Sequence, residues 1–266
     1  MAGHRYYRII KILMPLWLAC CCVTPATTYS QTVSPRASAF TEITPGTNQY
    51  EFAFTRLIYN GNDAGDWGPR WQVDWPQAEN HLLQGLSRLT RLNANPDGVL
   101  VRLTDDKIFD YPWVYAVEVG SLSLSNLEAE RLREYLLRGG FLMVDDFHGP
   151  AQWQNFAYAM KQVFPDRQIE NIPLDDSIFE ILYDINEHQQ IPGMRALSGG
   201  RTWERGGRVA RWRGIRDDHG RIMVAINFNM DMGDAWEHAD WAEYPHHYST
   251  LAYQFAVNYV LYSMTH

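Results

Sequence analysis

One stretch of the sequence indicates the fold class, Gly139-Gly140-Phe141-Leu142-Met143-Val144-Asp145-Asp146-Phe147-His148-Gly149. Two glycines are typical of a helix C-terminus, and the apolar run after them is typical of a short buried strand. Two carboxylates and an imidazole follow directly. Because ligands bind outside the carboxyl ends of strands in open α/β sheets, we expect Asp145, Asp146 and His148 to lie at a functional edge.

Short apolar strands alternate with helical periods from Tyr50 onward, which is typical of an α/β domain with a mostly parallel central sheet. Strands are predicted at 52–58, 99–103, 114–119, 141–144 and 221–228, and helices begin after Pro76, at the capping box Ser125–Glu128, at Pro150 and near His247. Residues 165–219 predict loops, one or two edge strands and a hairpin near 209–213.

The first 30 residues have the pattern of a signal peptide. Three basic residues precede an apolar run at 12–23, which is shorter than the roughly 20 residues that span a membrane. The run ends in a sequence close to a lipoprotein cleavage box, at Cys20 or Cys21. We therefore expect an exported chain, either attached to a membrane through an N-terminal lipid or secreted without one.

The remainder divides into a tether and one domain. Residues 31–48 are rich in Thr, Ser and Pro and predict a flexible tether. Residues 49–266 have the apolar content of a single packed domain. All three cysteines lie at 20–22, so the domain has no disulfide, thiolate nucleophile or cysteine-bound metal. The whole chain has a net charge of −8, and a protein this acidic is poorly suited to binding nucleic acid.

Carboxylates follow several of the predicted strands. Asp105-Asp106 and Asp145-Asp146 each follow a strand, and Asn227, Asn229 and Asp231 lie at the end of the late strand. Parallel strands would bring these ends to one edge, where the charges repel unless a divalent cation, arginines or raised pKa values compensate them. The alternative is that the acids cap helices and the histidines only pack. The candidate metal ligands are Asp145, Asp146, Asp231, Asp234 and His238, and His148 or His238 is the candidate acid or base of a metal-assisted hydrolysis.

Arginines and tryptophans add further candidates. Arg56 lies inside a predicted buried strand, and we expect an Asp at the sheet edge as its partner. Eight arginines and no lysine occur between 195 and 221, which fits either an anionic ligand or pairing with the acidic body. Trp67, Trp71 and Trp75 share one loop, and Trp236 and Trp241 flank the late acidic segment; they either bind a sugar or peptide or pin the loops.

Several motifs together resemble a known family. They are Phe54-Thr55-Arg56-Leu57, Tyr111-Pro112-Trp113, Val117-Glu118-Val119-Gly120, the Gly-Gly-Phe-Leu to Asp-Asp-Phe-His-Gly stretch, and Gly233-Asp234-Ala235-Trp236-Glu237 with Asp240. They resemble the bacterial domain-of-unknown-function family 4159, grouped with the class I glutamine-amidotransferase-like proteins. The resemblance implies a bacterial source and a three-layer, flavodoxin-like α/β fold, and it implies no established activity. Residues 49–266 contain no cysteine and no Gly-x-Ser-x-Gly elbow, so amidotransferase catalysis is excluded.

The sequence therefore predicts a ligand-binding or partner-binding protein of the periplasm or cell envelope. Two alternatives stay open, a metal-dependent hydrolase and a carbohydrate-binding or carbohydrate-processing protein. The partner would be an envelope protein, a small molecule or a glycan. The candidate ligand-binding residues are Arg56, Asp145, Asp146, His148, Asp231, Asp234, Trp236 and Glu237.

Overall fold

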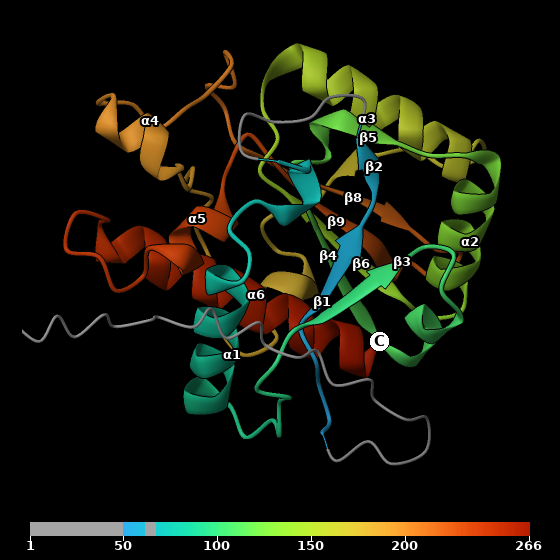
Figure 1. Ribbon diagram of the computed structural model, residues 1–266, viewed down its shortest axis with the longest axis horizontal. Coiled ribbons are helices and arrows are strands. Elements are labelled where there is room, and N and C mark those ends of the chain that lie inside the picture. Colours follow the sequence, from blue (N-terminus) through green and yellow to red (C-terminus); the bar gives the residue numbers. More distant parts are fainter. Residues whose placement is uncertain (1–49, 62–67) are drawn as a thin grey trace, which may run out of the picture. The chain divides into compact units, whose positions relative to one another are not determined.

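The computed structural model describes residues 50–61 and 68–266. Its centre is a seven-stranded sheet in the order β3-β1-β4-β6-β9-β8-β7 (Figure 1). The strands are β1 Thr55–Ile58, β3 Val99–Arg102, β4 Trp113–Val117, β6 Phe141–Asp145, β7 Glu170–Asn171, β8 Arg211–Arg216 and β9 Ile222–Phe228, and β2 (Asn60–Gly61) pairs separately with β5 (Leu122–Ser123). The predicted signal region, the tether and Trp67 lie outside the described residues.

Five adjacent strands are parallel, and β8, the next strand of the sheet, runs in the opposite direction. β3, β1, β4, β6 and β9 pair in parallel, whereas β8 is antiparallel to both of its neighbours. Every residue of β4, β6 and β9 is buried, as expected where helices cover both faces of a parallel sheet. The predicted α/β domain with a mostly parallel central sheet is confirmed.

Different helices cover the two faces of the sheet. On one face lie α1 (Gln77–Leu89), α5 (Met232–Glu237) and α6 (His246–Thr265), and on the other lie α2 (Asn126–Leu137) and α3 (Gly149–Val163) (Figure 1). Along β4 and β6, neighbouring residues alternate between the two cores, because side chains alternate along a strand. The shorter elements are η1 Arg70–Gln72, η2 Asp106–Asp110, η3 Val119–Ser121, η4 Ser177–Phe179 and α4 Met194–Ser198.

The passage from α2 to β6 follows the prediction. Ser125 and Glu128 form the capping box at the start of α2. At its end, a Cβ on Gly140 would overlap the ring of Tyr135, so the absence of a side chain lets the chain pass beneath that ring. The Tyr135 hydroxyl donates a hydrogen bond to the Tyr111 carbonyl at 2.9 Å. The glycines therefore end the helix and place β6 directly after it.

Two local predictions are wrong. The first strand begins at Thr55 rather than at Phe52, because Phe52 forms only an isolated bridge with Ala94. The expected hairpin near 209–213 lies further along the chain, where β8 pairs antiparallel with β9. Within the described ranges, no helix combines the length and the apolar character needed to cross a membrane.

Candidate functional site

Three neighbouring strands end in residues with left-handed backbone conformation. Glu118 follows β4, Asp146 follows β6 and Asn229 follows β9, with φ angles of 52°, 50° and 64°. Residues with side chains seldom adopt positive φ, and such positions concentrate at functional sites. The predicted carboxyl edge is therefore a place where the chain turns sharply and presents polar side chains.

Asp145 is a structural residue at this edge. Its Oδ2 accepts hydrogen bonds from the backbone N–H groups of Met232 at 2.6 Å and Gly233 at 3.1 Å. The hydroxyl of Tyr115 lies 3.4 Å from the same oxygen. Burial raises the pKa of Asp145 to about 7, although these hydrogen bonds oppose the shift. Asp145 thus holds the start of α5 against β6, and it is not a member of the two carboxylate clusters described below.

Three other carboxylates gather beside it. Asp74, Asp146 and Asp231 each offer one oxygen, and the three oxygens lie within 4.8 Å of one another. Asp74 precedes α1, and its φ is 63°. Its Oδ2 is buried and has no hydrogen-bond partner. Gly233 makes this approach feasible, because a Cβ there would overlap Asp74 Oδ2.

Asp74 was not among the predicted site residues. The signal in the sequence is weak, since Asp74 lies in a tryptophan-rich loop one residue before Trp75-Pro76. Asp231 was predicted, and it also caps α5, because its Oδ1 accepts a hydrogen bond from the Asp234 N–H at 2.8 Å. The Asp105-Asp106 pair does not join the cluster. Asp106 is exposed and pairs with Arg131 of α2 at 2.6 Å.

The electrostatics of the three clustered carboxylates are unfavourable. Burial raises the pKa of Asp74, Asp146 and Asp231 well above the usual range, and neighbouring carboxylates raise each of them further. Arg56 opposes the shift at Asp74. Three buried acids this close together are stable at neutral pH only when they share protons or a cation.

His148 is joined to the same cluster. Its Nε2 lies 3.0 Å from Asp146 Oδ1, and its side chain is buried. Burial lowers the pKa of His148 to about 4, and the charge of Arg205 contributes. If Nε2–H donates to Asp146, the lone pair is on Nδ1, a buried atom without a hydrogen-bond partner. The imidazole is therefore neutral at physiological pH.

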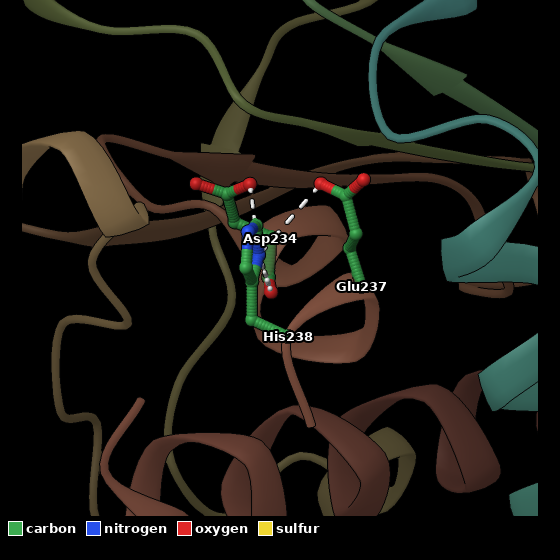
Figure 2. Close-up of side chains that lie close together, drawn as sticks. All are labelled: Asp234, Glu237 and His238. Atoms are coloured by element: carbon green, nitrogen blue, oxygen red, sulfur yellow. Dashed lines mark hydrogen bonds and ion pairs between the residues drawn. The ribbon is translucent and has the colours of Figure 1, made fainter. Parts of the chain in front are cut away.

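A second acidic cluster lies along α5. Figure 2 shows Asp234, Glu237 and His238 grouped together. The His238 Nδ1 lies 3.5 Å from Asp234 Oδ1, 3.7 Å from Glu237 Oε2 and 3.0 Å from the Asp234 carbonyl. Asp234 Oδ2 also accepts a hydrogen bond from the Met194 N–H at 2.7 Å. These predicted residues do lie together, and their polar atoms have more hydrogen-bond and ion-pair partners than those of the first cluster.

Two predicted ligand-binding residues lie in the core instead. Arg56 is buried and pairs with Glu79 of α1, so the expected Asp partner is wrong. Its guanidinium also donates to the carbonyls of Trp71 at 3.0 Å and Val73 at 2.9 Å, which positions the segment that carries Asp74. Trp236 is fully buried, with its ring centroid 5.5 Å from that of Tyr115.

Some arginines of the arginine-rich segment form ion pairs, and others line a cavity. Arg216 pairs with Glu170 and Asp176, and Arg221 pairs with Asp217. A polar cavity of about 390 Å³ is lined by Arg195, Ala196, Arg201, Glu204 and Arg205. A Cβ on Gly193 would lie 3.2 Å from the Glu204 carboxylate, and it would also contact Asp231 and Asp234. The cavity therefore lies beside the acidic edge.

The fold and this edge define an α/β domain whose buried acids converge where parallel strands end. A family described as a domain of unknown function, DUF4159, matches residues 53–264, and the chain belongs to that family. The match runs from just before β1 into α6, so it includes both carboxylate clusters. No curated protein matches the chain.

Proposed function

We propose that this domain binds a divalent cation through Asp74, Asp146 and Asp231, and that the cation anchors a ligand at the carboxyl edge. The carrying observation is Asp74 Oδ2, a buried oxygen without a hydrogen-bond partner inside a set of three carboxylates within 4.8 Å of one another. Two oxygens bound to Ca²⁺ at about 2.3–2.6 Å lie at most about 5 Å apart. The three side chains are therefore close enough to share one ion.

The donor set indicates the class of ion. Carboxylate oxygens alone suit Ca²⁺, Mg²⁺ or Mn²⁺ rather than softer metals. A bound cation would also relieve the repulsion that raises the pKa of all three acids. Arg56 takes this role only in part, because it opposes the shift at Asp74 while its charge is paired with Glu79.

The strand order supports this location. Counted along the chain, the five parallel strands follow the order 2-1-3-4-5, and this order supports the flavodoxin-like arrangement that the family resemblance implies. Such sheets bind ligands where the order reverses, here between β1 and β4. Asp74 lies on the connection that leaves β1, and Glu118 ends β4.

Export to the cell envelope is part of the proposal. It is supported by the basic and apolar pattern of residues 1–30 and by the tether-like composition of 31–48. The mass of the mature N-terminus, measured on protein from a bacterial envelope fraction, tests it. An N-terminus at Met1 in that material would contradict export by a cleaved signal.

Thermal unfolding tests the cation site. After treatment with EDTA, Ca²⁺, Mn²⁺ or Mg²⁺ should raise the Tm, since an ion at 100 times its Kd stabilises the fold by about 2.7 kcal/mol. Asp74→Asn and Asp231→Asn should abolish that response. The same variants should raise the Tm in EDTA, because each removes a repelling charge.

The opposite signs of these two effects separate a lost site from a damaged fold. Glu237→Gln is the matched control, since it neutralises an acid of the second cluster and should leave the response intact. If no cation shifts the Tm, or if Glu237→Gln alone removes the shift, the three-aspartate site is wrong.

A second function, metal-assisted hydrolysis, is favoured by His148. Its neutral imidazole is hydrogen-bonded to Asp146 and keeps an unpartnered Nδ1, so it can accept a proton from a water molecule. His238 is less suitable, because its Nδ1 is hydrogen-bonded to the Asp234 carbonyl. The bound cation would supply the activation of that water.

A panel of p-nitrophenyl phosphates, acetates and glycosides with Mn²⁺ or Ca²⁺ tests hydrolysis. We expect release of p-nitrophenol that EDTA abolishes. His148→Gln should reduce it at least 100-fold with cation binding retained. Release that persists in EDTA, or that survives in His148→Gln, would contradict this second function and leave the cation site standing.

A further inference from the structure

A second cavity, separate from both carboxylate clusters, has an unusual lining. It has a volume of about 300 Å³ and lies between the start of α3, strand β8 and the end of β9. Arg208, Arg211 and Arg213 line it, together with Trp153 and Phe228. No Asp or Glu among the described residues lines it, although the chain has a net charge of −8. The lining of this cavity therefore has three positively charged side chains and no negatively charged one, although the chain as a whole is acidic.

The three arginines have no carboxylate partner among the described residues. Their neighbours in the same hairpin differ, since Arg216 and Arg221 both form ion pairs. Burial and the adjacent charge of Arg211 lower the pKa of Arg213. Positive charge is therefore concentrated here without compensation, and an anion bound in the cavity would relieve it.

Two of the guanidinium groups are held in place by aromatic rings. The Arg213 Cζ lies 4.1 Å from the centroid of Trp153 and 5.8 Å from that of Phe228. The Arg208 Cζ lies 4.4 Å from the centroid of Trp203. The Arg213 Nε–H donates to Asn171 Oδ1 at 3.3 Å, and the terminal N–H groups of a guanidinium stacked on a ring can still donate to an oxyanion. The ordered position of the group lowers the entropy cost of binding.

The backbone at the start of α3 does not provide the anion site. The His148 N–H donates to Gln152 Oε1 at 2.5 Å, and the Gly149 N–H donates to Asn229 Oδ1 at 2.8 Å. The next residue is Pro150, which has no N–H. The arginine side chains that line the cavity are therefore its cationic donors.

An apolar wall accompanies these donors. The rings of Trp153 and Phe228 lie 4.9 Å apart, and Phe147 packs behind them at 5.0 Å from Phe228. Aromatic walls with a few convergent charged groups are typical of small-molecule sites. The wall would contact the body of a ligand whose charged group meets the arginines.

We infer that this cavity binds an organic anion, with a phosphate or carboxylate held by Arg208, Arg211 and Arg213 and an aromatic or apolar body against Trp153 and Phe228. The inference is independent of the proposed cation site, because no residue of the two carboxylate clusters lines the cavity. It assigns a class of ligand to arginines that form no ion pair among the described residues.

Calorimetric titration of the whole protein with phenyl phosphate, in EDTA and low salt, tests the inference. Phenyl phosphate should bind at least 10-fold more tightly than orthophosphate, which lacks the ring, and than phenol, which lacks the charge. Benzoate, titrated in parallel, distinguishes a preference for a carboxylate from one for a phosphate. EDTA removes any contribution of a divalent cation, so failure here leaves the cation site untouched.

Arg211→Gln and Arg213→Gln should each weaken phenyl phosphate binding at least 10-fold. If Arg213→Gln lowers the Tm, its weaker binding could reflect a damaged fold. Arg208→Gln then replaces it, because Arg208 is exposed, and it should weaken phenyl phosphate binding in the same way. Arg201→Gln is the matched control, because Arg201 also stacks on Trp203 but lines the other arginine cavity. The inference would be overturned if phenol bound as tightly as phenyl phosphate, or if Arg211→Gln bound phenyl phosphate as tightly as wild type. It would also be overturned if Arg201→Gln were the one variant with weakened binding.

Discussion

Arg56 of β1 and Glu79 of α1 form an ion pair whose side chains are only 1% and 2% exposed. The same guanidinium donates to the carbonyls of Trp71 and Val73. One buried cation therefore fixes a strand, a helix and the loop that carries Asp74. Its position determines where the unpartnered carboxylate of the proposed cation site lies.

Glu79→Gln should be strongly destabilising. It leaves the Arg56 charge buried without its counter-ion, which costs about 3–5 kcal/mol when one partner of a buried pair is removed. Urea unfolding measures the loss. Glu130→Gln is the control, since Glu130 is exposed on α2 and should stay within about 0.5 kcal/mol of wild type. A cost below about 1 kcal/mol for Glu79→Gln would show that the pair is dispensable.

Asp145 should tolerate Asn and not Ala. Its pKa is raised to about 7, so the folded state prefers the protonated form, and the ionised carboxylate weakens the fold as pH rises from about 4 through 7. In EDTA at pH 8, Asp145→Asn should be at least as stable as wild type, because an amide oxygen still accepts from Met232 and Gly233. Asp145→Ala should cost about 1–3 kcal/mol through the two unsatisfied N–H groups. Equal unfolding midpoints for the two variants would contradict this role.

His188 should make the fold sensitive to acid. Its ring stacks on Trp212 with centroids 4.0 Å apart, and burial lowers its pKa to about 4. Because this value is below the unfolded one, the stability it provides is complete above about pH 6.5 and is lost as pH falls toward 4. Between pH 7 and 5, wild type should lose about 1 kcal/mol more than His188→Gln, a figure reduced for the ring's partial contact with water.

The exposed His219 provides the control for that measurement. His219→Gln should follow the wild-type pH profile of urea unfolding. If His188→Gln and wild type have the same slope, the ring is not excluded from water in the way its packing indicates.

Gly233→Ala should weaken the proposed cation site. The new Cβ would overlap Asp74 Oδ2 and lie 2.9 Å from the Tyr115 hydroxyl, so Asp74 must move. We expect cation affinity to fall at least 10-fold, equivalent to about 1.4 kcal/mol, in a calorimetric titration with Ca²⁺ or Mn²⁺. Gly199→Ala is the control, since its nearest neighbour is the flexible Arg201 guanidinium at 3.3 Å. Unchanged affinity in Gly233→Ala would place the ion elsewhere.

The sequence predicted the parallel sheet and the location of the acidic edge because both depend on local patterns. The glycines before Phe141 and the apolar run up to Val144 define β6, and Asp146 follows from that strand. The sequence could not distinguish the roles of the adjacent Asp145 and Asp146. The left-handed φ of Asp146 sends one carboxylate into the cluster, while the other binds the amides of α5.

The parts that sequence reasoning missed depend on long-range contacts. Asp74 meets Asp146 and Asp231 across more than 70 positions of the chain, and no local pattern reports that meeting. The partner of Arg56 was misassigned because Glu79 lies next to Ala78 on the buried side of α1, where a charge is unexpected. Trp236 looked like a ligand contact because its neighbours are acidic, whereas it points into the core.

The two hydrogen bonds that Asp145 accepts from α5 make a pair of backbone amides sensitive to a buried charge. The N–H groups of Met232 and Gly233 donate to a side-chain carboxylate rather than to a backbone carbonyl. Their exchange with deuterium should therefore follow the ionisation of a single side chain in the interior. In the spectrum of this domain, these amides would report the electrostatic state of the acidic edge without any probe attached to it.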